Sequence, residues 1–344
     1  MSRRVLVRSV IGAAAVIFLI LLFHIPDVRT RYNYLCESTQ AATHFRSRDY
    51  HVKTIQPQRP VSHPHAATNE FIASAAAALK APGHFETRPT RTASYIHPTA
   101  SALPDKIVVI GRLQREDTDW VGRFLPEWQN AIYTVDNTSH ALHTQINKGR
   151  EANAYLSYIV ENYDKLPTTI AFVHSHRDGY PAGWHTDVQD YDNVISLQRL
   201  NIPFVQRNGY ANLRCIFSPG CPDEVQPFRD PPKELELDGV LDEGPSLDDV
   251  MKDVWPLFFG NNATIPEAIG TPCCAQFAVS RDQIRKRSLA EYEVYHEWLM
   301  ATKVSDAVSG RVFEYLWHII FGQGPVYCPE LEQCYQDVYG TGRS

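Results

Sequence analysis

The chain has 344 residues, with 33 basic and 39 acidic side chains and a formal net charge of -6 at pH 7. This length accommodates one large domain or two small ones. The mildly acidic charge gives no indication of a nucleic-acid-binding surface, so we expect no nucleic-acid partner.

The N-terminus predicts a membrane anchor. Arg3, Arg4 and Arg8 precede an apolar run over residues 9–25. The run is close to the roughly 17 to 25 residues that a helix needs to cross a bilayer. A cleaved signal peptide would have a shorter apolar core followed by small residues at a cleavage site, and the sequence FHIPDVRTRY offers no such site. We therefore expect a transmembrane signal anchor, with residues 1–8 in the cytosol.

Two features indicate that the rest of the chain lies in the lumen of the secretory pathway, in the Golgi or the endoplasmic reticulum. Asn137 and Asn262 each begin an N-glycosylation sequon, which predicts a glycoprotein. The chain also has seven cysteines, and an oxidising compartment favours disulfide bonds between them. The expected product is a single-pass membrane protein with a lumenal C-terminal domain.

The cysteines lie at spacings that suggest two small disulfide loops. Cys215 and Cys221 flank IFSPG, and Cys328 and Cys334 flank a similarly short segment. We expect each of these pairs to close its own loop. A cysteine zinc site is less favoured, because the chain has no C-x-x-C pair. The sequence leaves open the pairing of the other three: Cys36, Cys273 and Cys274.

Residues 26–104 are typical of a flexible stalk. They contain scattered Pro, His, Thr and Ala, and few sustained apolar patterns. One short alanine-rich helix is predicted over residues 69–79. Such a segment would hold a folded domain away from the membrane.

From Lys106 onward, strand and helix patterns alternate. IVVIGRL and AIYTVDNTS predict strands, and Trp120–Trp128 has a helical spacing. The segment beginning NKGREANAYLSY has one apolar helical face and is followed by the strand TIAFV. This alternation predicts a lumenal α/β domain over residues 105–335, with a mostly parallel central sheet and flanking helices, before a tail over 336–344.

Clustered histidines and carboxylates follow the apolar run Ile170–Val173. Ligands bind beyond the carboxyl ends of strands in open α/β sheets, so this position favours a functional site. The alternative is a polar loop whose histidines only cap and hydrogen-bond. We assign a divalent metal, manganese ahead of zinc, to four of these residues: His174, His176, His185 and Asp187. Asp178, in the same stretch, is a candidate catalytic residue.

The last third predicts two more helices. Ser280-Arg281-Asp282-Gln283 has a capping-box pattern and opens a helix predicted to run through Trp298. The second helix, SGRVFEYLWHIIFG, carries Glu314 and His318 one turn apart. They form either a satisfied buried network or part of a site, and we take both as candidate catalytic residues.

Several blocks in order resemble a known family over residues 106–334. They are NKGREANAYLSYIVENYDKLP, the strand into HSH, NLRCIFSPGCP, CCAQFAVSR and SGRVFEYLWHIIFG. Together they resemble a fungal membrane-protein family catalogued only as a domain of unknown function. That resemblance implies no established activity.

More distantly, the strand-first layout and the closing Glu-x-x-Trp helix resemble nucleotide-sugar glycosyltransferases of the mixed α/β, single-sheet type, the glycosyltransferase-A-like fold. Such enzymes are commonly anchored by one N-terminal helix and a stalk, and they usually place Asp-x-Asp after a strand to hold a metal against the donor's diphosphate. This chain has His174-Ser175-His176 there. The literal Asp190-Tyr191-Asp192 has no strand leading into it and fits a helix cap better.

The resemblance implies a lumenal enzyme that transfers a sugar from a nucleotide-sugar donor to an unknown acceptor. Lys148 and Arg150, near a helix start, would suit the diphosphate. Arg112 and Asp136, after the first two strands, would lie along the nucleoside. Simple exposed charge is the alternative for each of the four.

Two other functions remain open. One is a non-catalytic lumenal scaffold with the same fold. The other is a metal-dependent hydrolase, because His174-x-His176-x-Asp178 resembles the first metal motif of metallo-β-lactamase-type hydrolases. That motif normally continues with another histidine, and Gly179 stands at this position.

Overall fold

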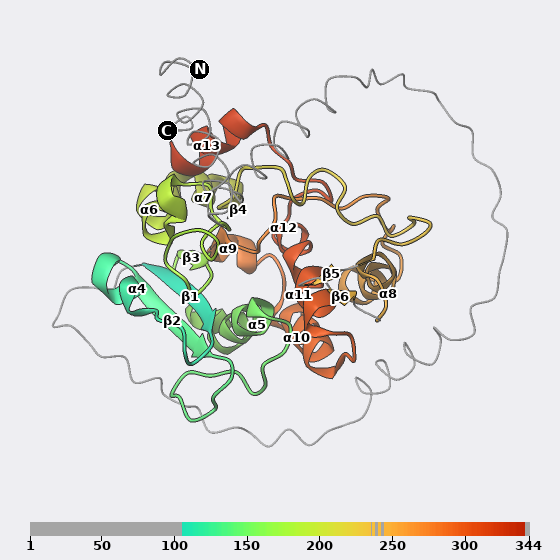
Figure 1. Ribbon diagram of the computed structural model, residues 1–344, viewed down its shortest axis with the longest axis horizontal. Coiled ribbons are helices and arrows are strands. Elements are labelled where there is room, and N and C mark those ends of the chain that lie inside the picture. The colour runs from blue at the N-terminus through green and yellow to red at the C-terminus, as the bar shows by residue number, and fades with distance from the viewer. Residues whose placement is uncertain (1–104, 235, 238–239, 242–243, 341–344) are drawn as a thin grey trace, which may run out of the picture. The chain divides into compact units, whose positions relative to one another are not determined.

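The computed structural model describes residues 105–234, 236–237, 240–241 and 244–340 (Figure 1). The predicted cytosolic tail, membrane anchor, stalk and short helix, and Cys36, all lie outside the described residues. Within the described part of the chain, no helix is both long and apolar enough to cross a membrane.

Five strands of the described chain form one mixed sheet in the order β2-β1-β3-β7-β4. Their bounds are β1 Lys106–Arg112, β2 Gln129–Thr134, β3 Thr169–Phe172, β4 Tyr210–Asn212 and β7 Phe277–Ser280. Strands β2, β1 and β3 are parallel, whereas β7 runs antiparallel to both β3 and β4. The predicted α/β class, with a mostly parallel sheet and flanking helices, is confirmed. A separate two-stranded sheet pairs β5 Glu236–Leu237 with β6 Val240–Leu241.

The helices cover both faces of the sheet. Their bounds are α4 Asp119–Phe124, α5 Glu151–Asn162, α6 Asn193–Arg199, α7 Ile202–Asn208, α8 Leu247–Phe259, α9 Arg281–Ile284, α10 Leu289–Ala301, α11 Asp306–Glu314, α12 Trp317–Ile320 and α13 Leu331–Tyr339, with short 3-10 turns at Tyr163–Lys165 and Gln189–Tyr191. Helices α5, α8, α10, α11 and α12 contribute to the core on one face, and α4, α6, α7 and α13 to the core on the other (Figure 1).

Alternation along the strands explains the two cores. In β1, Ile107 and Val109 face the α5 side, and Val108 and Ile110 face the α4 side. Because successive side chains of a strand point to opposite faces, a continuous apolar run is what a sheet covered on both sides requires. The predicted apolar face of α5 is buried in the first core. Gly111 allows α5 to approach closely, since a Cβ there would lie 3.0 Å from the Cβ of Ala154.

Two predicted helices are each interrupted. The helix predicted to start at Ser280 consists of α9 and α10, and the reciprocal capping box is made by Ser288 and Glu291 at the start of α10. The predicted helix over SGRVFEYLWHIIFG ends at Glu314 and resumes at Trp317. Large side chains on nearly every side of that segment are buried in the first core, and a single straight helix would not direct all of them there.

Three disulfide bonds link cysteines of the described chain, and they correct the expected pairing. Cys215 bonds to Cys334 and Cys221 to Cys328, so the two small loops predicted from spacing are wrong. The two cysteine-bearing segments lie side by side, and each cysteine therefore meets one from the other segment. The third bond joins adjacent residues, Cys273 and Cys274.

Candidate active site

The carboxyl ends of β1, β2, β3 and β4 lie at one edge of the sheet. Because β7 is antiparallel, the residues that precede it reach the same edge, and Phe277 pairs with Phe172 at the end of β3. The sequence HSH follows the end of β3 after one residue, Val173, and CCAQ directly precedes β7. Side chains distant in the sequence are thereby brought to one place.

Three histidine side chains converge at this edge. Nδ1 of His174 lies 3.2 Å from Nδ1 of His185, and Nε2 of His176 lies 3.1 Å from that same atom. One nitrogen from each ring lies within 4.8 Å of the others. Two nitrogens bound to one metal at about 2.0–2.1 Å, with a tetrahedral angle between them, are about 3.3 to 3.4 Å apart. The observed separations therefore suit a shared metal ion.

Burial keeps these imidazoles neutral. The pKa of His185 is lowered to about 4, first by burial and then by the neighbouring His176 and the Arg214 guanidinium. The pKa of His174 lies well below its usual value, first because of burial and then because of the neighbouring His185 and His176. Burial also lowers the pKa of His176. Neutral imidazole is the form that binds a metal, so the three rings can act as ligands at pH 7.

Hydrogen bonds fix the peptide segment that carries the first two histidines. The Ser175 hydroxyl donates to Oε2 of Glu116 at 2.7 Å, and the Trp120 indole donates to the Ser175 carbonyl at 2.8 Å. The Asn193 amide donates to the His176 carbonyl at 3.0 Å. These contacts hold the backbone between His174 and His176, so both rings project from a rigid segment.

A cavity of about 400 Å³ adjoins the cluster. Its lining joins the loop after β1 and helix α4 to the loop after β3: Glu116, Asp117, Asp119, Trp120, Arg123, Phe124, Ser175, His176, Arg177 and Asp178. Since His176 belongs to both the cluster and the cavity wall, a group bound in the cavity would lie beside a metal held by the histidines.

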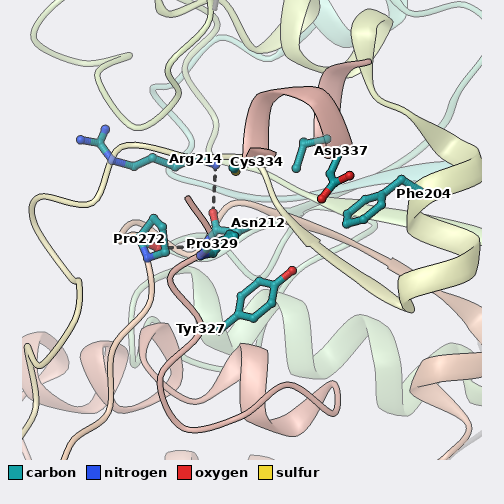
Figure 2. Close-up of a pocket in the computed structure, with 9 residues that line it drawn as sticks. Phe204, Asn212, Arg214, Pro272, Tyr327, Pro329, Cys334 and Asp337 are labelled. Atoms are coloured by element: carbon teal, nitrogen blue, oxygen red, sulfur yellow. Dashed lines mark hydrogen bonds between the residues drawn. The ribbon is translucent and has the colours of Figure 1, made fainter. Parts of the chain in front are cut away.

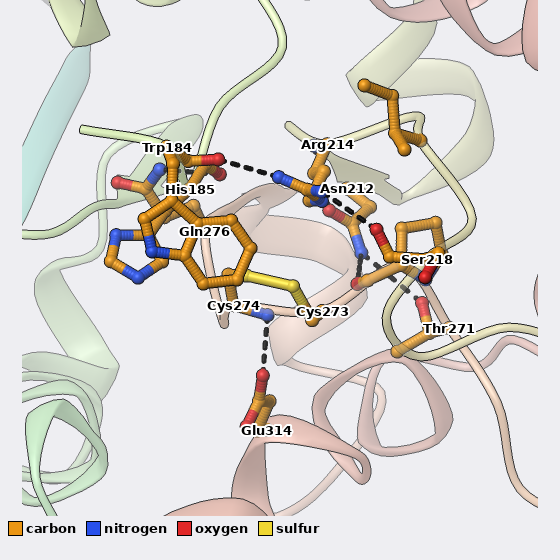
Figure 3. The surroundings of a disulfide bond; sticks show 12 residues. Trp184, His185, Asn212, Arg214, Ser218, Thr271, Cys273, Cys274, Gln276 and Glu314 are labelled. Atoms are coloured by element: carbon orange, nitrogen blue, oxygen red, sulfur yellow. Dashed lines mark hydrogen bonds between the residues drawn. A yellow bond between two sulfur atoms is a disulfide. The ribbon is translucent and has the colours of Figure 1, made fainter. Parts of the chain in front are cut away.

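Two carboxyl groups lie on another side of this edge. Glu314 accepts a hydrogen bond from the backbone N–H of Cys274 at 2.6 Å, beside the Cys273–Cys274 disulfide (Figure 3). Burial raises the pKa of Glu314, although Arg311 and the Cys274 N–H oppose the rise. The pKa of Glu151 is raised to about 7, mainly by burial and in part by the neighbouring Glu314 carboxylate. A carboxyl group poised near neutral pH is suited to proton transfer.

Residues 108–337 match the family model described as a protein of unknown function, DUF3431. The chain belongs to the DUF3431 family. The match runs from β1 into α13, so it includes the histidine cluster, both carboxyl groups and all three disulfides of the described chain. The sequence matches no curated protein. It matches no solved structure either.

Asp187 does not join the histidines in the DUF3431 domain. Its side chain is fully buried, accepts from the backbone N–H groups of Cys215 and Ile216, and forms an ion pair with Arg214 at 3.6 Å. The Arg214 guanidinium also lies 5.0 Å from the Trp184 ring, which is 4.6 Å from the ring of His185. Asp187 therefore ties the loop that carries His185 to the segment after β4, because its Oδ2 accepts from both backbone N–H groups and its Oδ1 faces the Arg214 guanidinium.

The other two catalytic candidates, Asp178 and His318, lie in different surroundings. Asp178 is exposed, pairs with Nε of Arg177 at 3.2 Å and lines the cavity. His318 is fully buried, and its Nε2 lies 3.0 Å from the Pro325 carbonyl. Burial lowers the pKa of His318 to about 4. Glu314 and His318 lie on either side of the break between α11 and α12, and they have different hydrogen-bond partners.

Three of the four residues expected to bind the nucleotide-sugar donor make contacts within the protein. Arg112 donates to the Glu116 carbonyl at 3.1 Å, and Asp136 accepts from the backbone N–H of Gln114 at 2.7 Å. Lys148 forms an ion pair with Asp306 at 3.3 Å. Only Arg150 of these four acts on the site, since its charge opposes protonation of His174 and lowers the pKa of Glu314.

A second cavity, near β4 and α13, is too small for a substrate. Its volume is about 10 Å³, close to the roughly 10–15 Å³ that one water requires. Figure 2 shows residues that line it. The residues around it include Asn212, Arg214 and Cys334. It is a packing gap next to a disulfide rather than a binding site.

Sequence reasoning missed residues whose contacts depend on tertiary structure. Gln276, Arg214 and Glu151 each contribute to the edge that carries the cluster. One signal was available for Gln276, because it is a long polar side chain at the start of an otherwise apolar strand run. A buried polar group in such a run requires partners.

Proposed function

We propose that this DUF3431 protein is a metal-dependent enzyme of the secretory pathway that transfers a sugar from a nucleotide-sugar donor. The proposal includes the single N-terminal membrane anchor and the lumenal placement of the catalytic domain. The observation that carries it is the convergence of three neutral imidazoles from the segment that follows β3, at the edge where an α/β sheet binds its ligands.

The donor set fits a divalent transition metal. His174, His176 and His185 supply three nitrogens, and no carboxylate of the described residues belongs to their group. Imidazole suits zinc and its neighbours, whereas manganese and magnesium prefer oxygen ligands. We therefore place zinc ahead of manganese. Such an ion would supply positive charge to a diphosphate leaving group.

The surrounding residues suit the remaining parts of a transfer reaction. The cavity beside His176 has room for the donor's nucleoside or sugar, and Arg150 adds positive charge near His174. Glu314, with its raised pKa, would accept a proton from the attacking hydroxyl group of the acceptor. A single mixed sheet with its site at the carboxyl edge supports the comparison with nucleotide-sugar transferases.

A metal-dependent hydrolase is the second candidate. The observation that favours it is the ligand set itself, because three protein ligands with a further open position are typical of zinc that activates water. In that case Glu314 would serve a water molecule instead of a sugar hydroxyl. The two functions share the metal and differ in whether a nucleotide binds beside it.

A thermal-shift experiment on the full-length protein in detergent distinguishes them. Zinc, manganese or a chelator is added, each with and without uridine or guanosine diphosphate. Ligand at 100 times its Kd stabilises by about 2.7 kcal/mol, which corresponds to a rise of roughly 5 to 10 °C for a domain of this size. His185→Ala should abolish the metal response, whereas His140→Ala, in the loop after β2, should retain it.

Each outcome has a definite meaning. Stabilisation by nucleotide diphosphate that requires metal supports the transferase. Stabilisation by metal alone, with release of product from an activated ester, supports the hydrolase. No metal response in the parent protein at micromolar zinc overturns both enzymes and leaves the scaffold.

A further inference from the structure

Gln276 occupies the junction between three segments of the site. It directly precedes β7. The two residues before it, Cys274 and Ala275, have φ of 92° and 50°, in the left-handed region. The chain therefore turns sharply before the strand begins. Gln276 is 1% exposed, so its polar atoms must find partners within the protein.

The backbone of Gln276 bonds to the segment after β4, and its side chain bonds to the segment after β3. Its carbonyl accepts from the Leu213 N–H at 2.9 Å, which extends the pairing on the β4 side. Backbone pairing with β3 stops at Phe172. Beyond Phe172, the side chain of Gln276, rather than its backbone, makes the hydrogen bond to the segment that continues from β3.

The side-chain amide then binds two of the three clustered histidines through their main chains. Its Oε1 accepts from the backbone N–H of His174 at 2.8 Å. Its Nε2 donates to the backbone carbonyl of His185 at 3.1 Å (Figure 3). An amide has a donor and an acceptor on one planar group, and neither a carboxylate nor an apolar side chain of similar size offers both.

We propose that Gln276 is the positioning residue that sets the spacing of His174 and His185 and thereby the affinity of the cluster for a transition metal. Its two side-chain hydrogen bonds go to main-chain atoms of these histidines. They fix the backbones from which both rings project, and these rings have their Nδ1 atoms 3.2 Å apart. The inference rests on the metal role proposed above.

Gln276→Leu removes both hydrogen bonds, and Gln276→Glu keeps the acceptor for His174 while placing an oxygen against the His185 carbonyl. Outer-shell substitutions of this kind weaken metal binding by roughly 10- to 100-fold. Gln283→Leu is the matched control, since Gln283 is 6% exposed and lies beyond the other end of β7. All variants are made in the full-length protein.

The measurements are the Kd for zinc, the visible spectrum of the cobalt-substituted protein and the melting temperature. We expect both Gln276 variants to bind zinc at least tenfold more weakly and to change the cobalt spectrum. Gln283→Leu should lose stability without either effect. The proposal is overturned if Gln276→Glu binds zinc as tightly as the parent. It is also overturned if Gln283→Leu, with a melting temperature similar to that of the Gln276 variants, weakens zinc binding as much as they do.

Failure of the metal role would be recognised separately. If the parent protein binds no zinc, the proposed function falls, and the positioning role is judged on metal-free protein by the imidazole ¹⁵N signals. Gln276→Glu should shift the signals of His174 and His185 while leaving those of His140 in place. Unchanged His174 and His185 signals would refute the positioning role even then.

Discussion

Cys215 is disulfide-bonded to Cys334, which lies 119 residues later in the chain. The N–H of Cys215 also donates to Asp187, whose loop carries His185. The bond therefore connects the C-terminal helix α13 to the segment that supports one of the clustered histidines. A second bond, between Cys221 and Cys328, runs alongside it.

The first prediction concerns these two bonds. Digestion of the unreduced protein should release one peptide pair containing Cys215 and Cys334 and another containing Cys221 and Cys328. Closing a loop of this length constrains the unfolded chain, so Cys334→Ser should lower the free energy of unfolding by about 2 to 5 kcal/mol. Peptide pairs that join Cys215 to Cys221 would contradict the pairing described above.

The second prediction separates Asp187 from the metal ligands. Asp187→Asn leaves Arg214 buried without its charged partner, and breaking a buried pair in this way costs about 3 to 5 kcal/mol. His185→Ala should abolish metal binding with a smaller loss of stability. Urea unfolding and zinc titration on both variants test this. The assignment fails if Asp187→Asn is as stable as the parent and has lost only its metal.

The third prediction concerns Glu314. Glu314→Gln keeps an oxygen that can accept from the Cys274 N–H, and it removes a carboxyl group whose charged form is disfavoured by burial. The melting temperature should therefore stay nearly unchanged, while activity falls by roughly a hundredfold or more. Glu297→Gln, at an exposed position of α10, should leave both unchanged. Full activity in a stable Glu314→Gln protein would remove Glu314 from the site.

The fourth prediction uses the pH dependence of stability. Burial raises the pKa of Glu151 to about 7 from 4.5, so between these values the folded protein binds more protons than the unfolded chain. Its stability must then fall as pH rises through this window. Glu151→Gln should match the parent near pH 4 and exceed it above pH 7, by an amount on the order of 3 kcal/mol.

Denaturant unfolding of both proteins at several pH values measures this difference. The comparison near pH 4 is an internal control, because Glu151 is then neutral in the folded parent protein. If the difference in free energy of unfolding between the two proteins does not grow with pH, then ionising Glu151 does not destabilise the folded protein, and the raised pKa is contradicted.

The parts of the fold that the sequence predicts are those with local causes. Apolar runs and a helical apolar face identify β1, β3 and α5, because strands and helices repeat their side-chain directions with fixed periods. The gathering of histidines near the end of β3 was predictable for the same reason, since polar residues follow a buried apolar run. His185 could be included because only a short loop separates it from His176.

Long-range pairing has no comparable local signal. Nothing in the four residues of β7 shows that they insert between β3 and β4, and without that insertion Gln276 has no visible connection to His174. The cysteine partners depend on which segments lie side by side. The break at Tyr315 depends on cores that form only in the folded protein.

The place of β7 in the sheet also determines when the protein can finish folding. Strands β3 and β4 leave the ribosome first, yet they are adjacent to β7 and not to each other. At about 5 to 20 residues per second, roughly 5 to 20 seconds pass between the synthesis of Phe172 and that of Phe277. During that interval the backbones of His174 and His185 lack the amide of Gln276. Cys215 and Cys221 are likewise made before the cysteines to which they bond, Cys334 and Cys328. The histidine cluster can therefore reach its final geometry only after the C-terminal third of the chain has been synthesised.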